Sequence, residues 1–493
     1  MKKPLLFFAF LITLVSFGQD GSLDTSFGNG GVVVTDLDNS EDLVLNVVEQ
    51  ADQKIIVSGV MIQNNQNYYP YLVRFMPDGT LDTAFGTNGL VLNNDNGFGD
   101  FMYLFIDDSQ NIIAAGPKNQ SSTFVIAKYL DDGNLDTTFA DSGIKTIPNG
   151  NYVGMTLLAD GSFLLLKFSS NNTITINHFL NNGSLDFNFG VNGAAISSYN
   201  GESFQGVEIK TDADNNIYFL GKRDNNANAD IILMKFNSDG YLDTSFGSNG
   251  MATKNLDAFN PMNSSTASLD FTNENKVVIA GSCGACVDLF EPVFQPYFLR
   301  YNPDGSPDTS FGSDGAVLLP VSSTYITGLN IQQNQRMVVS GQSLDCFEGS
   351  FYVLSRYYSS GFVDSSFNGE SPIEFNNTKT IMLEDGKIVT AGYTFWYNGE
   401  QDVVLLRHNN TTLSVPEYGN QKTTIYPNPS NGIFTIERAS FSENTPYTIT
   451  DITGKMIASG QFTEKQSQID LSAAHSGVYF LKTSNSVFRL LKN

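Results

Sequence analysis

The chain has 493 residues, of which 41% are hydrophobic, 12% are aromatic and only 16% are charged. This composition is too apolar and aromatic for a disordered chain, and the length exceeds that of one ordinary domain. The 51 acidic and 27 basic side chains give a formal net charge of −24, so the surface repels polyanions and nucleic acid is excluded as an expected partner.

The first 18 residues differ in composition from the rest of the chain. After two lysines, an apolar run extends from Pro4 to Phe17, and small residues stand three and one positions before Gln19. This pattern predicts a secretory signal peptide that is cleaved after Gly18. The run is shorter than the roughly 20 residues that a membrane-spanning helix needs. No later segment contains such a run, so we expect no transmembrane helix in the mature chain.

A seven-residue motif recurs seven times through the middle of the chain. Each copy begins with Gly, has Asp at its fourth position and ends with Phe, as in Gly21-Ser-Leu-Asp-Thr-Ser-Phe27. The copies begin 50 to 65 residues apart, at Gly21, Gly79, Gly133, Gly183, Gly240, Gly305 and Gly361. Self-similarity at this period indicates an array of one supersecondary unit.

Each unit is expected to contain four short strands. One apolar strand follows the motif, a second ends in a polar turn such as Asp385-Gly386, and a third begins directly after that turn. A fourth carries a basic residue or His before an aromatic residue or Leu, as in Arg74-Phe75. Four strands per roughly 55 residues are typical of a β-propeller blade. The predicted fold is all-β, with a seven-bladed β-propeller over residues 19–412.

The order of these parts predicts how the ring closes. If the strand before the polar turn is innermost, the chain begins with an unaccompanied outer strand at residues 31–35. It ends with three strands that lack an outer partner, at residues 378–383, 387–390 and 403–408. The N-terminal strand is therefore expected to complete the last blade. The alternative is an open solenoid, which needs polar capping repeats that the sequence does not show.

The motif resembles the delta-60 repeat of bacterial secreted proteins. The resemblance rests on the pattern Leu-Asp-x-x-Phe-Gly-x-x-Gly and on the hairpin Asp385–Ile388, and the seven copies cover residues 21–410. Some positions depart from the pattern, namely Pro307 and Val363 in place of Leu, Ala140 and Asn368 in place of Gly, and Ser371 in place of the last Gly. The resemblance implies a propeller-like fold and supplies no known activity.

The motif Asp occurs in every copy, at positions 24, 82, 136, 186, 243, 308 and 364. An acid repeated in every unit is most simply explained as a turn cap whose carboxylate accepts hydrogen bonds from nearby backbone N–H groups. The motif Phe is explained as a buried plug between blades. His178 and His408 occupy the strand position of the basic residues and are expected on blade surfaces.

Motifs that carry known chemistry are absent from the sequence. No segment follows the calcium-binding loop pattern, and there is no zinc-protease, Ser-hydrolase or phosphate-loop motif. We therefore assign no catalytic residue, no metal ligand and no cofactor from the sequence. Two carboxylates that converge only in the folded chain would escape such a search.

The three Cys lie in two neighbouring units. Cys283 and Cys286 are expected in the loop after the second strand of one blade, and Cys346 in the equivalent loop of the next. In a secreted protein this arrangement favours a disulfide. The hypothesis is a bridge from Cys346 to one of the other two, while a Cys283–Cys286 bridge and three free thiols are the alternatives.

These loops also carry the predicted ligand site. The same connection is longer than a hairpin needs in every unit, and in a propeller all seven emerge on one face. The predicted ligand-binding side chains are Tyr69, Phe290, Trp396 and Tyr397, with a glycan or a surface protein as ligand. Packing of the loops on one another explains the aromatic residues equally well. The functional hypothesis is a binding or adhesion module, and the alternative is a polysaccharide hydrolase or lyase that uses acidic residues in the propeller cavity.

Residues 413–422 are expected to form a linker, and residues 423–493 abandon the repeat. Short alternating strands separated by turn residues predict a small C-terminal β-sandwich. This segment resembles the C-terminal (type A) sorting domain of cargo of the type IX secretion system. The matching positions are Pro427, Asn428, Pro429, Gly432, Asp451, Gly454, Lys455, Gly477, Tyr479 and Lys492.

That resemblance implies a partner and a location. Such domains are recognised by the outer-membrane translocon of the type IX secretion system and are usually clipped off. The body is then released or attached to the outer surface, so the expected location is secreted or outer cell surface. An ordinary C-terminal sandwich without a sorting role is the alternative.

Overall fold

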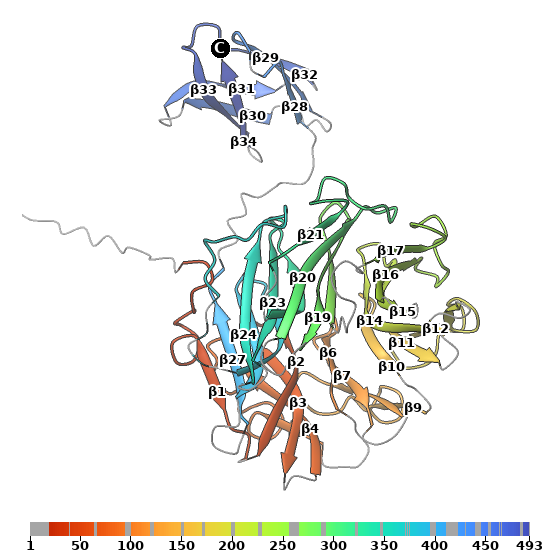
Figure 1. Ribbon diagram of the computed structural model, residues 1–493. Helices are drawn as coiled ribbons and strands as arrows, with labels where there is room; N and C mark the ends of the chain where they lie inside the picture. The colour runs from red at the N-terminus through yellow and green to blue at the C-terminus, as the bar shows by residue number, and fades with distance from the viewer. Residues whose placement is uncertain are drawn as a thin grey trace, which may run out of the picture. The chain divides into compact units, whose positions relative to one another are not determined.

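The chain forms two compact units, residues 1–411 and 412–493, in the computed structural model (Figure 1). The structure describes residues 19–492 except 39, 64–66, 94–99, 119–122, 149–151, 170–172, 199–202, 225–228, 256–265, 287–291, 321–323, 346–348, 370, 372, 374, 395–400, 411–422, 429, 439–444, 452–454, 463, 465 and 484–486. The expected signal peptide and linker therefore lie outside the described residues. Within the described chain, no helix has the length and apolar character that crossing a bilayer requires.

The described residues of the first unit form seven antiparallel sheets, which we number as blades 1 to 7. Blade 1 consists of β2 (Glu41–Glu49), β3 (Ile55–Gln63), β4 (Asn67–Phe75) and β5 (Leu90–Leu92). Blade 2 consists of β6 (Tyr103–Ile106), β7 (Ile112–Pro117), β8 (Phe124–Tyr129) and β9 (Ile144–Ile147). Blade 3 consists of β10 (Tyr152–Leu157), β11 (Phe163–Ser169), β12 (Thr173–Phe179) and β13 (Ala194–Ser198). Blade 4 consists of β14 (Ser203–Thr211), β15 (Ile217–Asp224), β16 (Ala229–Phe236) and β17 (Met251–Asn255). Blade 5 consists of β18 (Thr266–Phe271), β19 (Val277–Cys286), β20 (Pro292–Tyr301) and β21 (Ala316–Leu318). Blade 6 is β22 (Thr324–Ile331), β23 (Met337–Asp345) and β24 (Gly349–Tyr357), and blade 7 is β25 (Phe375–Met382), β26 (Ile388–Thr394), β27 (Val403–His408) and β1 (Val32–Thr35).

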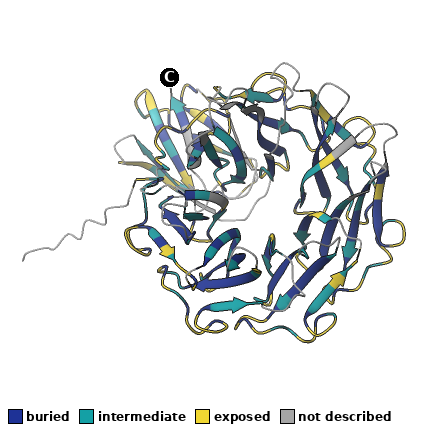
Figure 2. Ribbon diagram, turned by 60° about the horizontal axis from the view of Figure 1, so that its bottom comes forward, coloured by how far each residue is buried: buried dark blue, intermediate teal, exposed yellow. Residues whose placement is uncertain are grey.

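The predicted β-propeller and its closure are both confirmed. The sheets stand around a ring (Figure 2), and the N-terminal strand β1 pairs antiparallel with β27, from Val32 opposite Leu406 to Thr35 opposite Val403. Blade 6 has three strands within the described residues. Its missing outer strand would follow the motif copy in which Asn368 and Ser371 replace Gly, which is the least regular copy in the sequence.

The middle strands of each blade are buried on both faces, so they appear as apolar runs without alternation. In β3 every residue from Ile55 to Met61 is buried, as the dark blue strands of Figure 2 illustrate. The motif Phe lies where two blades meet. Phe85, for example, is fully buried in a cluster with Leu72 of blade 1 and Leu104 of blade 2. The predicted role of this Phe as a plug between blades is confirmed.

The motif Asp caps its own turn, as predicted. In all seven copies one carboxylate oxygen accepts the backbone N–H of the residue two positions on, at 3.0 to 3.2 Å. In six copies the other oxygen also pairs with the basic residue or His of the third blade strand: Arg407 with Asp24, Arg74 with Asp82, His178 with Asp186, Lys235 with Asp243, Arg300 with Asp308 and Arg356 with Asp364. The exception among described residues is Lys128, which pairs with the hairpin residue Asp107.

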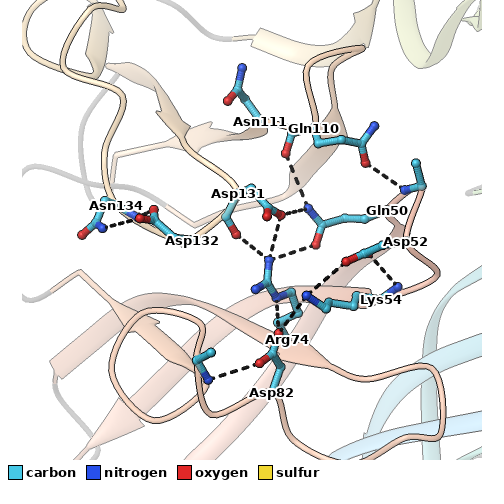
Figure 3. Close-up of polar contacts among 12 residues, drawn as sticks. Gln50, Asp52, Lys54, Arg74, Asp82, Gln110, Asn111, Asp131, Asp132 and Asn134 are labelled. Atoms are coloured by element: carbon cyan, nitrogen blue, oxygen red, sulfur yellow. Dashed lines mark hydrogen bonds and ion pairs between the residues drawn. The ribbon is translucent and has the colours of Figure 1, made fainter.

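The ion pair also determines how neighbouring blades attach. Figure 3 shows Arg74 of blade 1 bound to Asp82 through Nε and to Asp131, at the turn after β8 of blade 2, through Nη1 at 2.9 Å. Gln50 joins the same group, because its Nε2 donates to Asp131 at 2.7 Å. The Arg74 guanidinium lies 4.5 Å from the centre of the Phe85 ring, so one side chain contacts the turn, the plug and the next blade.

The same attachment recurs around the ring through the backbone. The N–H at the position after the motif Phe donates to a carbonyl in the turn before the next motif, as from Gly86 to Asp132 at 2.9 Å and from Gly247 to Asp304 at 2.7 Å. Close approach at this point explains the motif Gly. Gly305 has φ of +81°, and a Cβ there would lie 2.5 Å from the backbone nitrogen of Gly247.

The charge state of the motif Asp follows from these contacts. Burial alone would raise the pKa of Asp24, but hydrogen bonds from Ser26 and Lys387 and the charge of Arg407 outweigh burial and lower that pKa to about 2. Since the folded-state pKa lies below the unfolded value, this group stabilises the fold above about pH 4 and loses that effect as the pH falls toward 2.

The second unit, described by itself, is a sandwich of two antiparallel sheets, as predicted. One sheet has the order β28 (Thr423–Tyr426), β29 (Ile433–Arg438) and β32 (Gln466–Asp470). The other has the order β31 (Met456–Phe462), β30 (Thr445–Asp451), β33 (Gly477–Thr483) and β34 (Val487–Lys492). Their facing side chains form one core that includes Phe434, Ile449 and Leu481.

Replacing Asp364 with Asn tests the contribution of the motif ion pair. The side chains of Asp364 and Arg356 are both 0% exposed and pair at 2.8 Å. The Asn amide carries no charge to replace the carboxylate, although Asp20 still lies 2.8 Å from the Arg356 guanidinium. The cost is therefore at the lower end of the range for breaking a buried pair from one side, about 3 kcal/mol. We expect Asp364→Asn to lower the free energy of unfolding by that amount in urea denaturation of the mature chain.

The matched control is Asp186→Asn in blade 3. Asp186 caps an equivalent turn, but its side chain is 21% exposed and its partner is His178 rather than Arg. We expect this variant to lose less than about 1 kcal/mol. Equal losses for the two variants would mean that the turn cap, and not the buried ion pair, carries the stability.

Candidate functional site

The inner strands of all seven blades line one axial cavity of about 440 Å³. Side chains alternate along each strand between the blade core and the axis. In β14, for example, Ile209 is buried in the core, while Glu208 and Lys210 line the cavity. The residues that line the cavity therefore lie on the inner strands, outside the seven-residue motif that identifies each repeat in the sequence.

A β-bulge recurs at the same place in five of the described inner strands and orients the residue that follows it. These bulges precede Asn46, Gly154, Glu208, Gly328 and Lys379, and all five residues line the cavity. Bulges re-aim side chains and are frequent next to functional sites. One level of the axis therefore presents an acid, a base, an amide and two glycines.

Charged groups on blades 4 and 5 are paired with one another. Lys210 Nζ lies 3.0 Å from Asp270 and donates to the carbonyl of Leu269 at 2.9 Å. Glu208 accepts the backbone N–H of Leu269 at 2.7 Å. Burial would lower the pKa of Lys210, but the carboxylates of Asp270 and Glu208 outweigh burial and raise it.

Lys379 of blade 7 differs from these groups. Its side chain is exposed to the cavity, and among the described residues nothing lies within ion-pair or hydrogen-bond distance of its amine. Protein nevertheless surrounds the cavity, so burial lowers the pKa of this amine; Glu208 opposes the shift and Lys210 adds to it. Lys379 is therefore a cation without a described partner in an enclosed space.

The cavity continues into a wider mouth at the ends of the inner strands. The mouth measures about 480 Å³ and shares Val48, Phe105 and Ile381 with the cavity. Its walls are apolar except for Glu49 and Glu384. A ligand that enters through this mouth passes its apolar walls and the two acids before it reaches Lys210 and Lys379.

Of the four predicted ligand-binding residues the structure describes Tyr69, which does not line this cavity. Tyr69 lies on β4, where it packs against the core shared by blades 7 and 1. Phe290, Trp396 and Tyr397 lie outside the described residues. The aromatic-loop hypothesis thus stays a prediction for those three positions, whereas Tyr69 has a packing role.

Two further sequence expectations change. Cys283 and Cys286 lie on strand β19 rather than in the loop that follows it, while their side chains and Cys346 lie outside the description, so the disulfide stays untested. His408 is fully buried and stacks on Tyr352 at 6.0 Å between ring centroids; the expected surface position was wrong because Arg407 holds the basic position of this strand. His178 is half-buried between Asp186 and Ser162.

A group of three acids lies where β1, β2 and β27 meet. Carboxylate oxygens of Asp36, Asp42 and Asp402 lie within 4.8 Å of one another. Burial raises the pKa of Asp42 to about 7, and the charges of Asp36 and Asp402 add to this although hydrogen bonds from Ser40 and Leu37 oppose it. Nothing else in the described chain indicates a bound ion there.

The predicted sorting residues, in contrast, hold the second unit together. Asn428 accepts the N–H of Leu491 at 2.8 Å, Asp451 caps its hairpin by accepting the N–H of Lys455 at 3.1 Å, and the Tyr479 hydroxyl donates to the carbonyl of His475 at 2.6 Å. At the chain end, Lys492 donates to the carbonyl of Ala474 at 2.8 Å. Pro429 and Gly454 lie outside the described residues.

Comparison with protein families agrees with both units. Residues 424–492 match the family described as secretion system C-terminal sorting domain. Residues 50–85, 111–139, 213–246, 275–311 and 383–410 match the family described as Domain of unknown function (DUF5122) beta-propeller. Together these matches identify a β-propeller protein that carries a C-terminal sorting domain of the type IX secretion system. It is therefore exported to the cell surface or the extracellular space.

Solved structures similar to this β-propeller protein are distant from it. They include virginiamycin B lyase from Staphylococcus aureus, with 10% identity, a TM-score of 0.43 and coverage of 76% of this chain and 98% of that chain. Polysaccharide lyase Uly1 has 12% identity and a TM-score of 0.43, with coverage of 81% of this chain and 94% of that chain. PorZ, a type IX secretion component of Porphyromonas gingivalis, has 11% identity and a TM-score of 0.33, with coverage of 94% of this chain and 75% of that chain. No curated protein matches the sequence. At these values the similarities say nothing about activity or ligand.

The raised pKa of Asp42 makes the stability of the β-propeller protein depend on pH. The pKa of this carboxyl is about 7 in the folded chain and about 4 in an unfolded one, so its contribution to stability falls as the pH rises from about 4 to about 7. Asp42→Asn removes this loss. We expect the free energy of unfolding of Asp42→Asn, relative to that of the wild type, to increase by about 2 to 3 kcal/mol when the pH is raised from 5 to 8.

The measurement is urea denaturation of both proteins at the two pH values. Asp108→Asn is the control, because Asp108 is an exposed hairpin acid. Its difference from the wild type should be the same at both pH values. A pH-independent difference for Asp42→Asn would show that Asp42 is ionised in the folded protein.

Proposed function

We propose that this protein is an exported binding module whose ligand occupies the axial cavity of the propeller. The observation that carries the proposal is the set of recurrent bulges that place Asn46, Glu208 and Lys379 at one level of the axis. Ligand sites are concave spaces with a few convergent polar groups. The cavity combines such groups with an open mouth of about 480 Å³.

The sorting domain supports a role outside the cell. Its match over residues 424–492 accounts for export, so the ligand belongs to the surroundings of the cell or to its surface. The aromatic loops at Trp396 and Tyr397 remain a second proposed contact for a glycan or surface protein. Loss of binding after Trp396→Ala and Tyr397→Ala would assign the ligand to those loops instead of the cavity.

The alternative function, a polysaccharide hydrolase or lyase, would use two acids in the cavity. Glu208 is the one carboxylate among the described residues that line the cavity, and it is bound to Ser268 and to the N–H of Leu269. Paired-carboxylate hydrolysis needs a second acid at a separation of about 5 to 9.5 Å. The described lining therefore supports binding better than this chemistry, and release of reducing or unsaturated ends from acidic polysaccharides would reverse the preference.

Filling the cavity tests the proposal. Thr156 lines the cavity, and no hydrogen bond of its side chain is described, so Thr156→Trp should occupy the space while leaving the blade core intact. We expect a ligand found by screening the mature chain against small metabolites and glycans to lose most of its affinity for this variant in calorimetric titration.

The control is Thr253→Trp on the outer strand β17, where Thr253 is exposed. This variant carries the same added bulk away from the axis and should bind as the wild type does. A ligand that binds Thr156→Trp with unchanged affinity would place the site outside the axial cavity.

A further inference from the structure

The charges of the axial cavity do not balance at Lys379. Lys210 is neutralised by Asp270 at 3.0 Å, and Glu208 is engaged by the blade 5 backbone. Within the described residues no carboxylate reaches the Lys379 amine. An anion at this position would form an ion pair with an amine that no described carboxylate already engages.

We propose that the axial cavity binds a small polyhydroxylated carboxylate, such as a sugar acid, with its carboxylate on Lys379. This inference rests on the proposed binding function and specifies the ligand class. The ammonium of Lys379 provides a charge-assisted hydrogen bond to the carboxylate. Lys210 also lines the cavity but is already paired with Asp270, so Lys379 is the cation that the carboxylate meets.

The remaining lining supplies partners for hydroxyl groups. Asn46 and Asn330 place amides at the cavity, and each uses one amide N–H on a neighbouring carbonyl, of Met102 and of Thr380. The Thr156 side chain also lines the cavity, and no hydrogen bond of its hydroxyl is described. Amide and hydroxyl groups that retain bonding capacity match a ligand with several hydroxyls better than an apolar acid.

Two features select a small ligand with a single negative charge. A ligand the size of one sugar ring fits within the cavity of about 440 Å³. Glu49 and Glu384 at the mouth, together with the net charge of −24, repel polyanions. An acidic polysaccharide is therefore disfavoured, whereas one carboxylate can reach the lysines.

The test is calorimetric titration of the mature full-length chain with D-glucuronate, with D-glucose as the neutral counterpart and inorganic sulfate as the anion without hydroxyls. We expect glucuronate to bind and glucose to bind at least about tenfold more weakly, because the charged hydrogen bond is worth about 1.5 to 3 kcal/mol. Sulfate should also bind more weakly than glucuronate. Equal affinity for glucose and glucuronate, or no binding of glucuronate, would overturn the proposal.

Three variants assign the effect to Lys379. Lys379→Gln should reduce the glucuronate affinity about tenfold to a hundredfold, and Lys379→Arg, which keeps the charge, should restore most of it. Lys145→Gln on the outer strand β9 removes an equal charge away from the axis and should leave the affinity unchanged. Unchanged glucuronate binding by Lys379→Gln with a melting temperature like that of the wild type would refute the assignment.

The outcomes separate this inference from the proposed function. If a different ligand emerges from screening, and Thr156→Trp abolishes its binding while Lys379→Gln does not, the cavity is the site and the ligand class is wrong. If glucuronate binds Thr156→Trp and wild type equally, both the cavity proposal and the Lys379 proposal fail.

Discussion

The carboxylate of the motif Asp is the group on which the propeller depends. It accepts the N–H of its own turn and, in six copies, pairs with a side chain of the third blade strand, which is Arg or Lys in five copies and His178 in the sixth. In blade 1 the paired residue, Arg74, also contacts Asp131 in a turn of the next blade. One residue type per repeat therefore specifies a turn, attaches that turn to its own sheet and connects the sheet to its neighbour. Because the same contacts recur at each junction, the ring is held by many moderate interactions and by no single large one.

Many of the acidic side chains have this structural role. Motif acids such as Asp308 and Asp364 are neutralised locally by Arg300 and Arg356, and hairpin acids such as Asp107 cap turns. These groups maintain the fold and are not available to a partner. The axis shows a different pattern, since Lys379 stands there without a described counter-charge. The distribution of paired and unpaired charge therefore supports the proposed binding site more directly than the total charge does.

The repeat made the fold predictable, and the same property hid the site. Motif spacing was sufficient to predict the blades, the strand order and the pairing of β1 with β27, because these depend on features that every copy shares. The cavity depends on residues that differ between copies. Asn46, Gly154, Glu208 and Lys379 occupy one structural position and have four different chemistries, so no recurrent signal marks them. Their shared feature is a bulge, which depends on pairing register and cannot be read from strand composition. The aromatic loops were chosen for composition alone, and the described one, Tyr69, packs in the core.

The pairing of β1 with β27 links the first described strand to the last blade, from Val32 opposite Leu406 to Thr35 opposite Val403. Contacts between such distant segments form late in folding, because the loop between them must first be ordered. The sorting domain follows directly after that last blade in chain order. A product that terminates before β27 therefore lacks both the partner of β1 and the export signal. Because the sorting domain follows the last blade, a chain that carries the export signal also contains every strand that the closed ring requires.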